Sequence, residues 1–298
     1  GDKYQTIAES NRIYQKPISP VRGFIYDRNG TLLAENIVQR DLYVTPAYIE
    51  DSAETILKLS NLLDVPYELL DENFSRGVKK VKKFDSFPLV KALNEEQIAK
   101  AKVNLDSISG IEVKATLKRY VLHEETLAHV LGYVGDISSD DIRRDKLLAE
   151  LQNTQIGKTG IEKEFDYVLR GKPGIQTQER DVKGKLVRIL DTQGAEDGKD
   201  IYLTIDQKLQ DHLFKLFENR RGALVALEPK TGLVRALISS PSFNPNILNS
   251  IVDTDEVESL FSNKESPIFN RAISGQYPPA STLKPFVGLA AIENEVIS

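Results

Sequence analysis

One serine and one lysine near the end of the chain have the types and spacing for nucleophilic catalysis. Ser281 and Lys284 stand three residues apart, and Pro278 and Pro279 stop any helix from running through the serine. The apolar stretch 285–292 predicts a mostly buried helix that begins near Ser281. On such a helix the two side chains share a face, so the lysine amine can approach the serine hydroxyl.

These two residue types together suit acyl transfer. A serine hydroxyl is a weak nucleophile until a neighbouring base takes its proton, and a lysine is such a base only in its neutral form. The start of a helix adds backbone N–H groups and partial positive charge, which stabilise an oxyanion. Ser281 is therefore a candidate nucleophile and Lys284 its candidate general base.

The spacing alone has a second interpretation. In a chain of this composition, chance predicts roughly 1.5 Ser-x-x-Lys matches. A serine that caps an ordinary amphipathic helix, followed by a solvated lysine, fits the same spacing. The sequence around the pair has to decide between the two.

Composition narrows the class of protein. The 298 residues suggest about two domains, and 40% hydrophobic with 28% charged residues is ordinary for a globular protein. The net charge of −5 gives no reason to expect nucleic acid, and the basic run 77–84 is interpreted as a solvated strand edge. With no cysteine, a disulfide scaffold or thiolate metal site is excluded.

The histidines do not form a zinc motif. His123 and His129 are six residues apart, whereas a metalloprotease helix needs histidines at i and i+4 to place both on one face. We expect 127–131 to be a buried helix on which His129 is hydrogen-bonded structurally. The segment 157–160 also lacks the spacing of a phosphate-binding loop. No metal or organic cofactor is expected.

Local patterns predict the elements that surround the pair. Asn29-Gly30 predicts the turn of a hairpin over 22–36. Helical spacing predicts helices over 4–14, 54–63 and 94–102. The last third reads as a strand over 200–205, a helix over 206–219 and a long hairpin over 222–239.

Three stretches resemble one family. The sequence Tyr-Pro-Pro-Ala-Ser-Thr-Leu-Lys-Pro-Phe over 277–286 resembles the nucleophile motif of penicillin-binding proteins. The hairpin 22–36 and the stretch 128–134 resemble the non-catalytic region of their class B members. The double proline is similar to the elongation-type proteins of that class, and Ala280 replaces the usual glycine, a small-for-small exchange.

The resemblance implies an α+β, multi-domain fold. It predicts a β-rich, elongated anchor or pedestal region over 1–55, with an inserted α/β head over 56–118. The second part of the pedestal and a linker follow over 119–195. Residues 196–298 would begin a transpeptidase domain, an α/β domain with an antiparallel sheet. The head is expected to be separately mobile.

The resemblance also implies a reaction and its partners. Ser281 would be the acylated nucleophile and Lys284 the general base of a peptidoglycan D,D-transpeptidase that acts in cell-wall elongation. Its partners would be peptidoglycan stem peptides, β-lactam antibiotics and a membrane glycan polymerase, with no nucleic acid. A hydrophobic anchor upstream of Gly1 would hold the protein in the bacterial inner membrane, with the domains in the periplasm.

The family's later motifs are missing from the sequence. A Ser-x-Asn and a Lys-Thr-Gly follow the nucleophile in the family, whereas the triplets at 158–160 and 230–232 and the loop 242–244 all precede Ser281. We interpret these three as structural turns and expect the 298 residues alone to be inactive. Two alternatives stay open: a non-catalytic module that binds and regulates the polymerase, and a relative that senses or hydrolyses β-lactams.

Overall fold

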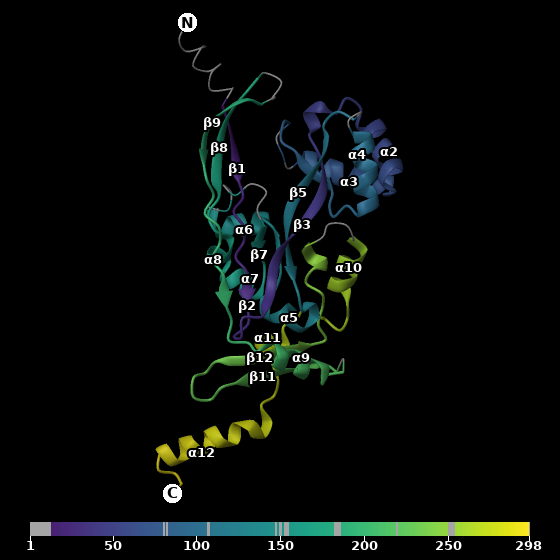
Figure 1. Cartoon of the computed structure of the whole chain (residues 1–298). Coiled ribbons are helices and arrows are strands. Elements are labelled where there is room, and N and C mark those ends of the chain that lie inside the picture. The colour runs from purple at the N-terminus through teal and green to yellow at the C-terminus, as the bar shows by residue number, and fades with distance from the viewer. Residues whose placement is uncertain are drawn as a thin grey trace.

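Two long antiparallel strands, β3 (Leu32–Val44) and β5 (Ile111–Val121), form the axis of the computed structural model (Figure 1). They pair without a break from Ala34 opposite Val121 to Val44 opposite Ile111. The structure describes residues 13–79, 81, 83–105, 108–146, 148, 151, 155–181, 186–218, 220–249 and 254–297.

Three short strands complete the sheet around this ladder. Strands β2 (Ile25–Tyr26) and β4 (Phe87–Val90) pair with opposite ends of β3, and β10 (Ile201–Tyr202) runs parallel to β2. The predicted hairpin over 22–36 is confirmed. Its turn is held by Asp27, whose Oδ1 accepts the N–H groups of Asn29 at 2.8 Å and Thr31 at 2.7 Å. Gly30 has a φ of 83°, which glycine adopts without strain.

Helices cover one end of the ladder. The segment η1 (Pro46–Tyr48) leads from β3 into α2 (Ser52–Leu63) and α3 (Tyr67–Val78), and α4 (Glu95–Asn104) precedes β5. Asp51 caps α2, and Asn94 forms a capping box with Gln97 at the start of α4, so the predicted helices over 54–63 and 94–102 are confirmed. A core packs between these helices and the strands, formed by Leu42, Val44, Ile56, Leu59, Leu63, Leu70, Phe87, Leu89, Val90, Leu93, Ala101, Leu105 and Ile111.

Two predictions near the N-terminal half need correction. The basic run 77–84 was expected to be a strand edge, but its described residues end α3 and continue as a turn, with Lys79 as the C-cap of the helix. Helix α3 extends through Val78, so the first two residues of the run are helical. The predicted helix over 4–14 lies outside the described residues as far as residue 12, and residues 13 and 14 begin strand β1 (Ile13–Ile18).

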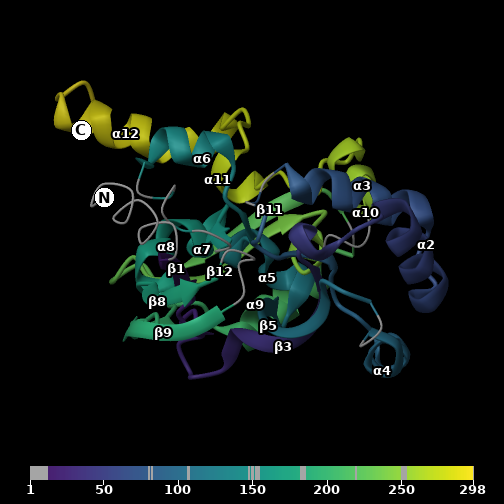
Figure 2. The ribbon, with the colours of Figure 1, turned by 90° about the horizontal axis from the view of Figure 1, so that it is seen from above.

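A second, three-stranded sheet lies on the other side of the ladder from the helices α2, α3 and α4 (Figures 1 and 2). Its strands have the order β1, β8 (Gly174–Arg180), β9 (Leu186–Gln193). Along the chain, the elements from β5 to β8 are α5 (Glu124–Leu131), β6 (Val134–Asp136), α6 (Ser139–Arg144), β7 (Gln155–Gly157), α7 (Gly160–Glu164) and α8 (Asp166–Arg170). A second core gathers Ile25, Leu33, Ala34, Val121, Leu127, Leu131 and Leu169.

A buried charge network connects separate segments of the chain. Glu162, on α7, has no exposed surface and accepts hydrogen bonds from Arg22 Nε at 2.7 Å and Arg119 Nε at 2.6 Å. Asp166 accepts from Arg22 Nη1 and from Arg170 Nη1, each at 2.8 Å. Two carboxylates therefore bind three arginines from three separate segments of the chain.

The last third follows its predicted order. Asp206 caps α9 (Gln207–Lys215), and β11 (Gly222–Leu227) pairs with β12 (Val234–Ser240), so the predicted helix and hairpin are confirmed. The predicted strand over 200–205 is present only as the short β10. After η4 (Ile247–Asn249) come α10 (Thr254–Ser262), α11 (Arg271–Ser274), η5 (Ala280–Leu283) and α12 (Lys284–Glu293).

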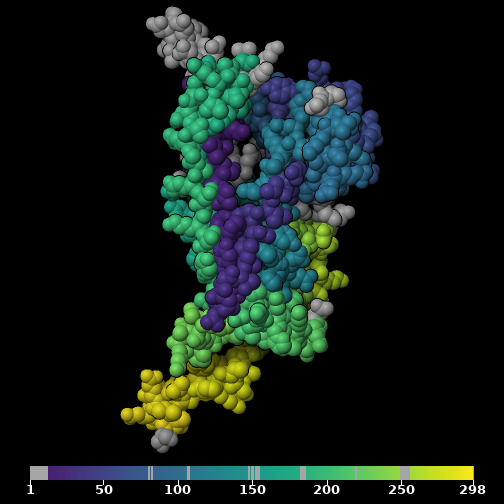
Figure 3. All heavy atoms as spheres, viewed as in Figure 1, coloured from purple at the N-terminus to yellow at the C-terminus, as the bar shows by residue number. Residues whose placement is uncertain are grey.

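The predicted burial of the final helix is wrong. Helix α12 extends away from the body as a separate projection (Figures 1 and 3). Phe286 is 68% exposed and Leu289 64%, and every residue of 284–293 is exposed except Gly288 and Ala291, which are half-buried. The helix is apolar as expected, but among the described residues no surface covers it. None of the described helices combines the length and the apolar character needed to cross a membrane.

Candidate active site

The structure places Ser281 and Lys284 on one side of a single tight turn. Ser281 lies in the 3₁₀ segment η5, and the backbone N–H of Lys284, the first residue of α12, bonds to the carbonyl of Ser281. Side chains at i and i+3 eclipse each other in a 3₁₀ turn, so the two lie in line along the same face. This is the relative placement that the spacing predicts.

Both side chains of this pair are exposed. Among the described residues, neither the Ser281 hydroxyl nor the Lys284 amine has a hydrogen bond or ion pair, although the neighbouring Thr282 hydroxyl bonds to the carbonyl of Pro279. A neutral lysine base needs burial or a nearby cation. The described residues align the pair but do not bury the lysine.

The residue before the serine has an unusual backbone. Ala280 has a φ of 45°, in the left-handed region that glycine adopts freely and that costs other residues about 1–2 kcal/mol. The exchange of the family's usual glycine for Ala280 is therefore more than a change of small side chains. It places backbone strain directly ahead of the candidate nucleophile.

The two Lys-Thr-Gly triplets are structural, as predicted. Thr159 precedes α7 as its N-cap residue, and the Lys158 amine forms an ion pair with Asp141. Burial alone would raise the pKa of Asp141, but hydrogen bonds from Lys158 and Ser138 outweigh it and hold the pKa at about 2. The second triplet forms the turn between β11 and β12, where Gly232 has a φ of 73°.

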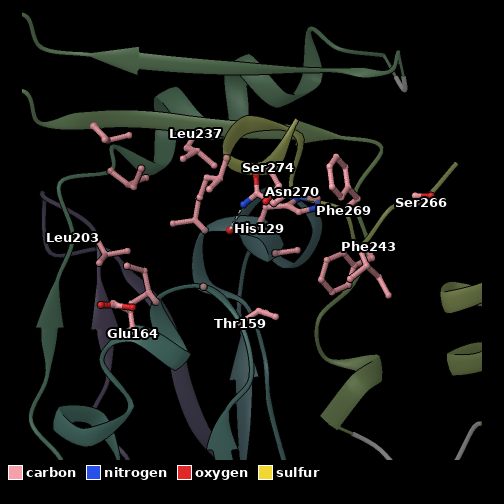
Figure 4. Close-up of a pocket in the computed structure, with 18 of the residues that line it drawn as sticks. His129, Thr159, Glu164, Leu203, Leu237, Phe243, Ser266, Phe269, Asn270 and Ser274 are labelled. Carbon is pink, nitrogen blue, oxygen red and sulfur yellow. Dashed lines mark hydrogen bonds between the residues drawn. The ribbon is translucent and has the colours of Figure 1, made fainter. Parts of the chain in front are cut away.

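A cavity of about 900 Å³ lies where the pedestal meets the last third of the chain (Figure 4). Helices α5 and α7 form one wall, and β12, α11 and the chain around Phe269 form the other. Most of its lining is apolar, from residues such as Val130, Ile161, Leu203, Leu237, Phe243 and Ile273. Sequence patterns gave no sign of this cavity, because its two walls come from segments that are far apart in the chain.

His129 lies in the wall of this cavity as a structural residue, as predicted. Its Nε2 lies 2.8 Å from the carbonyl oxygen of Pro267, and its Nδ1 lies 3.3 Å from the hydroxyl of Ser242. Burial, together with the positive charge of Arg271, lowers the pKa of His129 to about 4, although the bond to Pro267 opposes this. Within the described parts of the chain, no group of three or more His, Asp or Glu side chains could hold a metal ion.

Polar side chains join the two sides of this junction. The Gln210 amide donates to the carbonyls of Thr126 and Leu237, each at 2.7 Å, and accepts the N–H of Leu237 at 2.9 Å. The Asn246 amide bonds to both the N–H and the C=O of Val121, each at 2.9 Å. Sequence reasoning missed both residues, since a single Gln or Asn carries no pattern that reveals a distant partner.

The comparisons with known proteins agree with this architecture. Residues 17–203 match the family model of the Penicillin-binding Protein dimerisation domain, and 222–298 match that of the Penicillin binding protein transpeptidase domain. The chain therefore belongs to the class B penicillin-binding proteins, with a dimerisation domain followed by the first part of a transpeptidase domain.

Within that class the chain is a homologue of the elongation-type, cell-shape transpeptidases. It is 37% identical to the peptidoglycan D,D-transpeptidase MrdA of Haemophilus influenzae, over 100% of this chain and 46% of the relative. It is also 37% identical to MrdA of Escherichia coli K12, over 99% of this chain and 47% of the relative. The chain thus spans about half the length of the curated relatives it matches.

A solved structure shares the fold. The complex between the penicillin-binding protein PBP2 and MreC from Helicobacter pylori aligns with a TM-score of 0.81 and 27% sequence identity. The alignment covers 95% of this chain and 53% of the solved one. The likeness therefore extends over the pedestal, the helices α2 to α4 and the last third together.

Proposed function

We propose that the whole protein is a peptidoglycan D,D-transpeptidase of cell-wall elongation, with Ser281 as its nucleophile and Lys284 as its general base. The observation that carries this proposal is the alignment of the two side chains across one turn of η5, inside the region that matches the transpeptidase domain. The similarity to MrdA over the full chain supports the choice of substrate.

The reaction proceeds in two acyl transfers. Lys284 takes the Ser281 proton as Oγ bonds to the penultimate D-Ala carbonyl of a stem peptide, and an oxyanion forms. The C–N bond to the terminal D-Ala then breaks, and that amine leaves with the proton from Lys284. An amine of a neighbouring stem peptide attacks the acyl-enzyme, Lys284 accepts its proton, and Ser281 leaves with a proton restored. None of these steps uses a metal or an organic cofactor.

The same serine would react with β-lactams, which present a strained acyl group to it. The proposal also includes an anchor in the bacterial inner membrane and a periplasmic location for the described residues. It assigns 1–55 and 119–195 to the pedestal and 56–118 to a head. Residues 196–298 would then begin the transpeptidase domain.

Labelling of the complete protein with penicillin tests the site. Mass spectrometry should find one adduct, on Ser281, and Ser281→Ala should abolish it. Lys284→Ala should slow acylation by about 10²–10⁴, the usual cost of removing a general base, with little effect on folding. Lys264→Ala is the matched control, because Lys264 is an exposed lysine of the same region outside the site, and its rate should equal that of the wild type.

The 298-residue chain should behave differently from the complete protein. Loss of one oxyanion donor costs on the order of 10²–10³ in rate. Without the later motifs of the family, acylation should be too slow to detect. An adduct on another serine in the complete protein, or rapid labelling of the 298 residues, would contradict the assignment.

A second function, as an interaction module, is favoured by one observation. The match to the dimerisation domain covers 17–203, well over half of the chain, and the similar Helicobacter pylori protein was solved in complex with MreC. We infer that the 298 residues bind a protein partner of the elongation machinery, such as an MreC homologue or a membrane glycan polymerase. Retained binding without penicillin labelling would separate this function from catalysis, and loss of binding in the 298 residues would refute it.

A further inference from the structure

The turn formed by residues 265–271 connects the pedestal to the segment that carries Ser281. This turn enters from α10 and continues directly into α11, the last element before η5. Its side chains and backbone bond to helix α5 of the dimerisation domain on one side and to strand β12 on the other. Figure 4 shows His129 and Asn270 facing each other in the wall of the cavity.

Asn270 uses both ends of its side-chain amide, each on a different part of the molecule. Its Oδ1 accepts the N–H of Ala272 at 3.1 Å and so caps α11, while its Nδ2 donates to the backbone carbonyl of His129 at 3.1 Å. The imidazole of His129 in turn binds the carbonyl of Pro267 in the same turn, at 2.8 Å. One residue of α5 therefore holds the turn at two points, three residues apart.

Hydrogen bonds of Arg271 restrict the conformation of the turn. Arg271 is buried, and its guanidinium donates to the backbone carbonyls of Ser266 at 3.0 Å and Phe269 at 3.3 Å, as well as to that of Glu265. Its own N–H donates to Ser239 Oγ on β12 at 2.9 Å. A side chain that binds three carbonyls of the loop around it leaves that loop little freedom.

The path from α11 to Ser281 is also restricted. A Cβ at Gly275 would lie 2.5 Å from the carbonyl oxygen of Arg271 and from the Tyr277 ring, so the chain folds closely back on itself there. Pro278 and Pro279 then fix two successive φ angles. These two features restrict the backbone between α11 and Ser281, which is only six residues long.

The cavity explains why the polar bonds matter for orientation. Residues of both α5 and α11 line the cavity of about 900 Å³, so side-chain packing between the two helices is incomplete there. The amide of Asn270 and the ring of His129 bridge the gap at its edge.

We propose that Asn270 and His129 are positioning residues, which set the placement of Ser281 relative to the dimerisation domain through α11. The proposal rests on the assignment of Ser281 as the nucleophile. It adds a route by which a change at the pedestal alters the rate of acylation. Neither residue touches the reacting atoms.

The test compares acylation rates of the complete protein with a fluorescent penicillin, resolved into the rate constant of the chemical step and the dissociation constant. Asn270→Ser keeps a good helix cap but is too short to reach the carbonyl of His129. We expect its chemical step to be about three- to tenfold slower, the factor that corresponds to one lost hydrogen bond. Asn263→Ser is the matched control: within the described parts of the chain, the Oδ1 of Asn263 accepts only the nearby N–H of Glu265, and the rate of this variant should not change.

A pair of His129 variants gives an independent reading if Asn270→Ser folds poorly. His129→Leu loses the bond to Pro267 and should slow the chemical step by a similar factor. His129→Gln has an amide that can still donate to that carbonyl and should restore most of the rate. Equal rates for Leu and Gln would overturn the positioning role, as would a wild-type rate for Asn270→Ser.

The outcome for Ser281→Ala keeps the two claims apart. If Ser281→Ala abolishes labelling while Asn270→Ser labels at the wild-type rate, the nucleophile is right and the positioning role is wrong. If Ser281→Ala labels normally, the proposed catalytic function itself fails and the positioning role fails with it.

Discussion

The substitution Glu162→Gln should lower the Tm of the 298-residue chain strongly. Glu162 has no exposed surface, and it is the shared carboxylate of Arg22 and Arg119, whose side chains are 10% and 2% exposed. Glutamine keeps the shape, removes the negative charge, and turns an N–H donor toward a group that is itself a donor. Arg22 would keep its bond to Asp166, whereas Arg119 would lose its 2.6 Å ion pair, although the charge of Asp200 still acts on it.

The magnitude follows from the burial of the network. Burial already lowers the pKa of Arg119, and the charge and hydrogen bond of Glu162 oppose that shift. Removing one partner of a buried ion pair costs about 3–5 kcal/mol, because the remaining charge is left without compensation. For a cooperative unit of 150–250 residues, 1 kcal/mol corresponds to about 2–4 °C, so the expected fall in Tm is roughly 6–20 °C.

Differential scanning calorimetry of the 298-residue chain measures this fall. Glu164→Gln is the matched control, since Glu164 is two residues further along and exposed, and its effect should stay within about 0.5 kcal/mol. Hydrogen exchange should show the loss of protection in β7 and α8 and not in α2. Similar Tm values for the two variants would mean that the network contributes no net stability and would refute the reasoning.

Two further predictions concern pH and motion. Burial lowers the pKa of His129 from 6.5 to about 4. Between these two pH values the unfolded chain binds a proton at His129, whereas the folded chain does not. Stability from this residue is therefore complete above pH 6.5 and falls by up to about 3 kcal/mol as the pH approaches 4. Urea unfolding at pH 7.5 and 4.5 should show this loss in the wild type and less of it in His129→Gln, and equal losses would contradict it. Residues 56–118 should exchange amide hydrogens faster, or move further between states, than 222–239, and uniform protection across the two would count against a separately mobile head.

The features that the sequence predicted well are those set by neighbouring residues. The hairpin over 22–36 depends on Asn29-Gly30 and on Asp27 two residues earlier, and the caps Asp51, Asn94 and Asp206 each act within three residues. The alignment of the serine and lysine is local in the same sense. Each of these needs only a short window of chain.

What the sequence left open depends on partners far along the chain. Arg22 meets Glu162 across 140 residues, and His129 meets Pro267 across 138, and no periodicity encodes such a pairing. The burial of α12 was predicted wrongly for a related reason. An apolar pattern states that a helix needs a covering surface, but it does not state which atoms provide that surface.

The ladder of β3 and β5 has a consequence for how the chain tolerates insertions. Its eleven paired positions extend over roughly 35 Å, and its two ends enter two different hydrophobic cores, with Ala34 and Val121 in one and Val44 and Ile111 in the other. Side chains alternate between the two faces along a strand, so these core residues at the two ends of the ladder lie on the same face. One residue added midway along β3 would turn the core side chains at one end to the opposite face, unless a bulge absorbed the extra residue. Two added residues would leave the side chains at both ends on their original face. Lengthening of this ribbon in steps of two residues is therefore the change that both cores can accept.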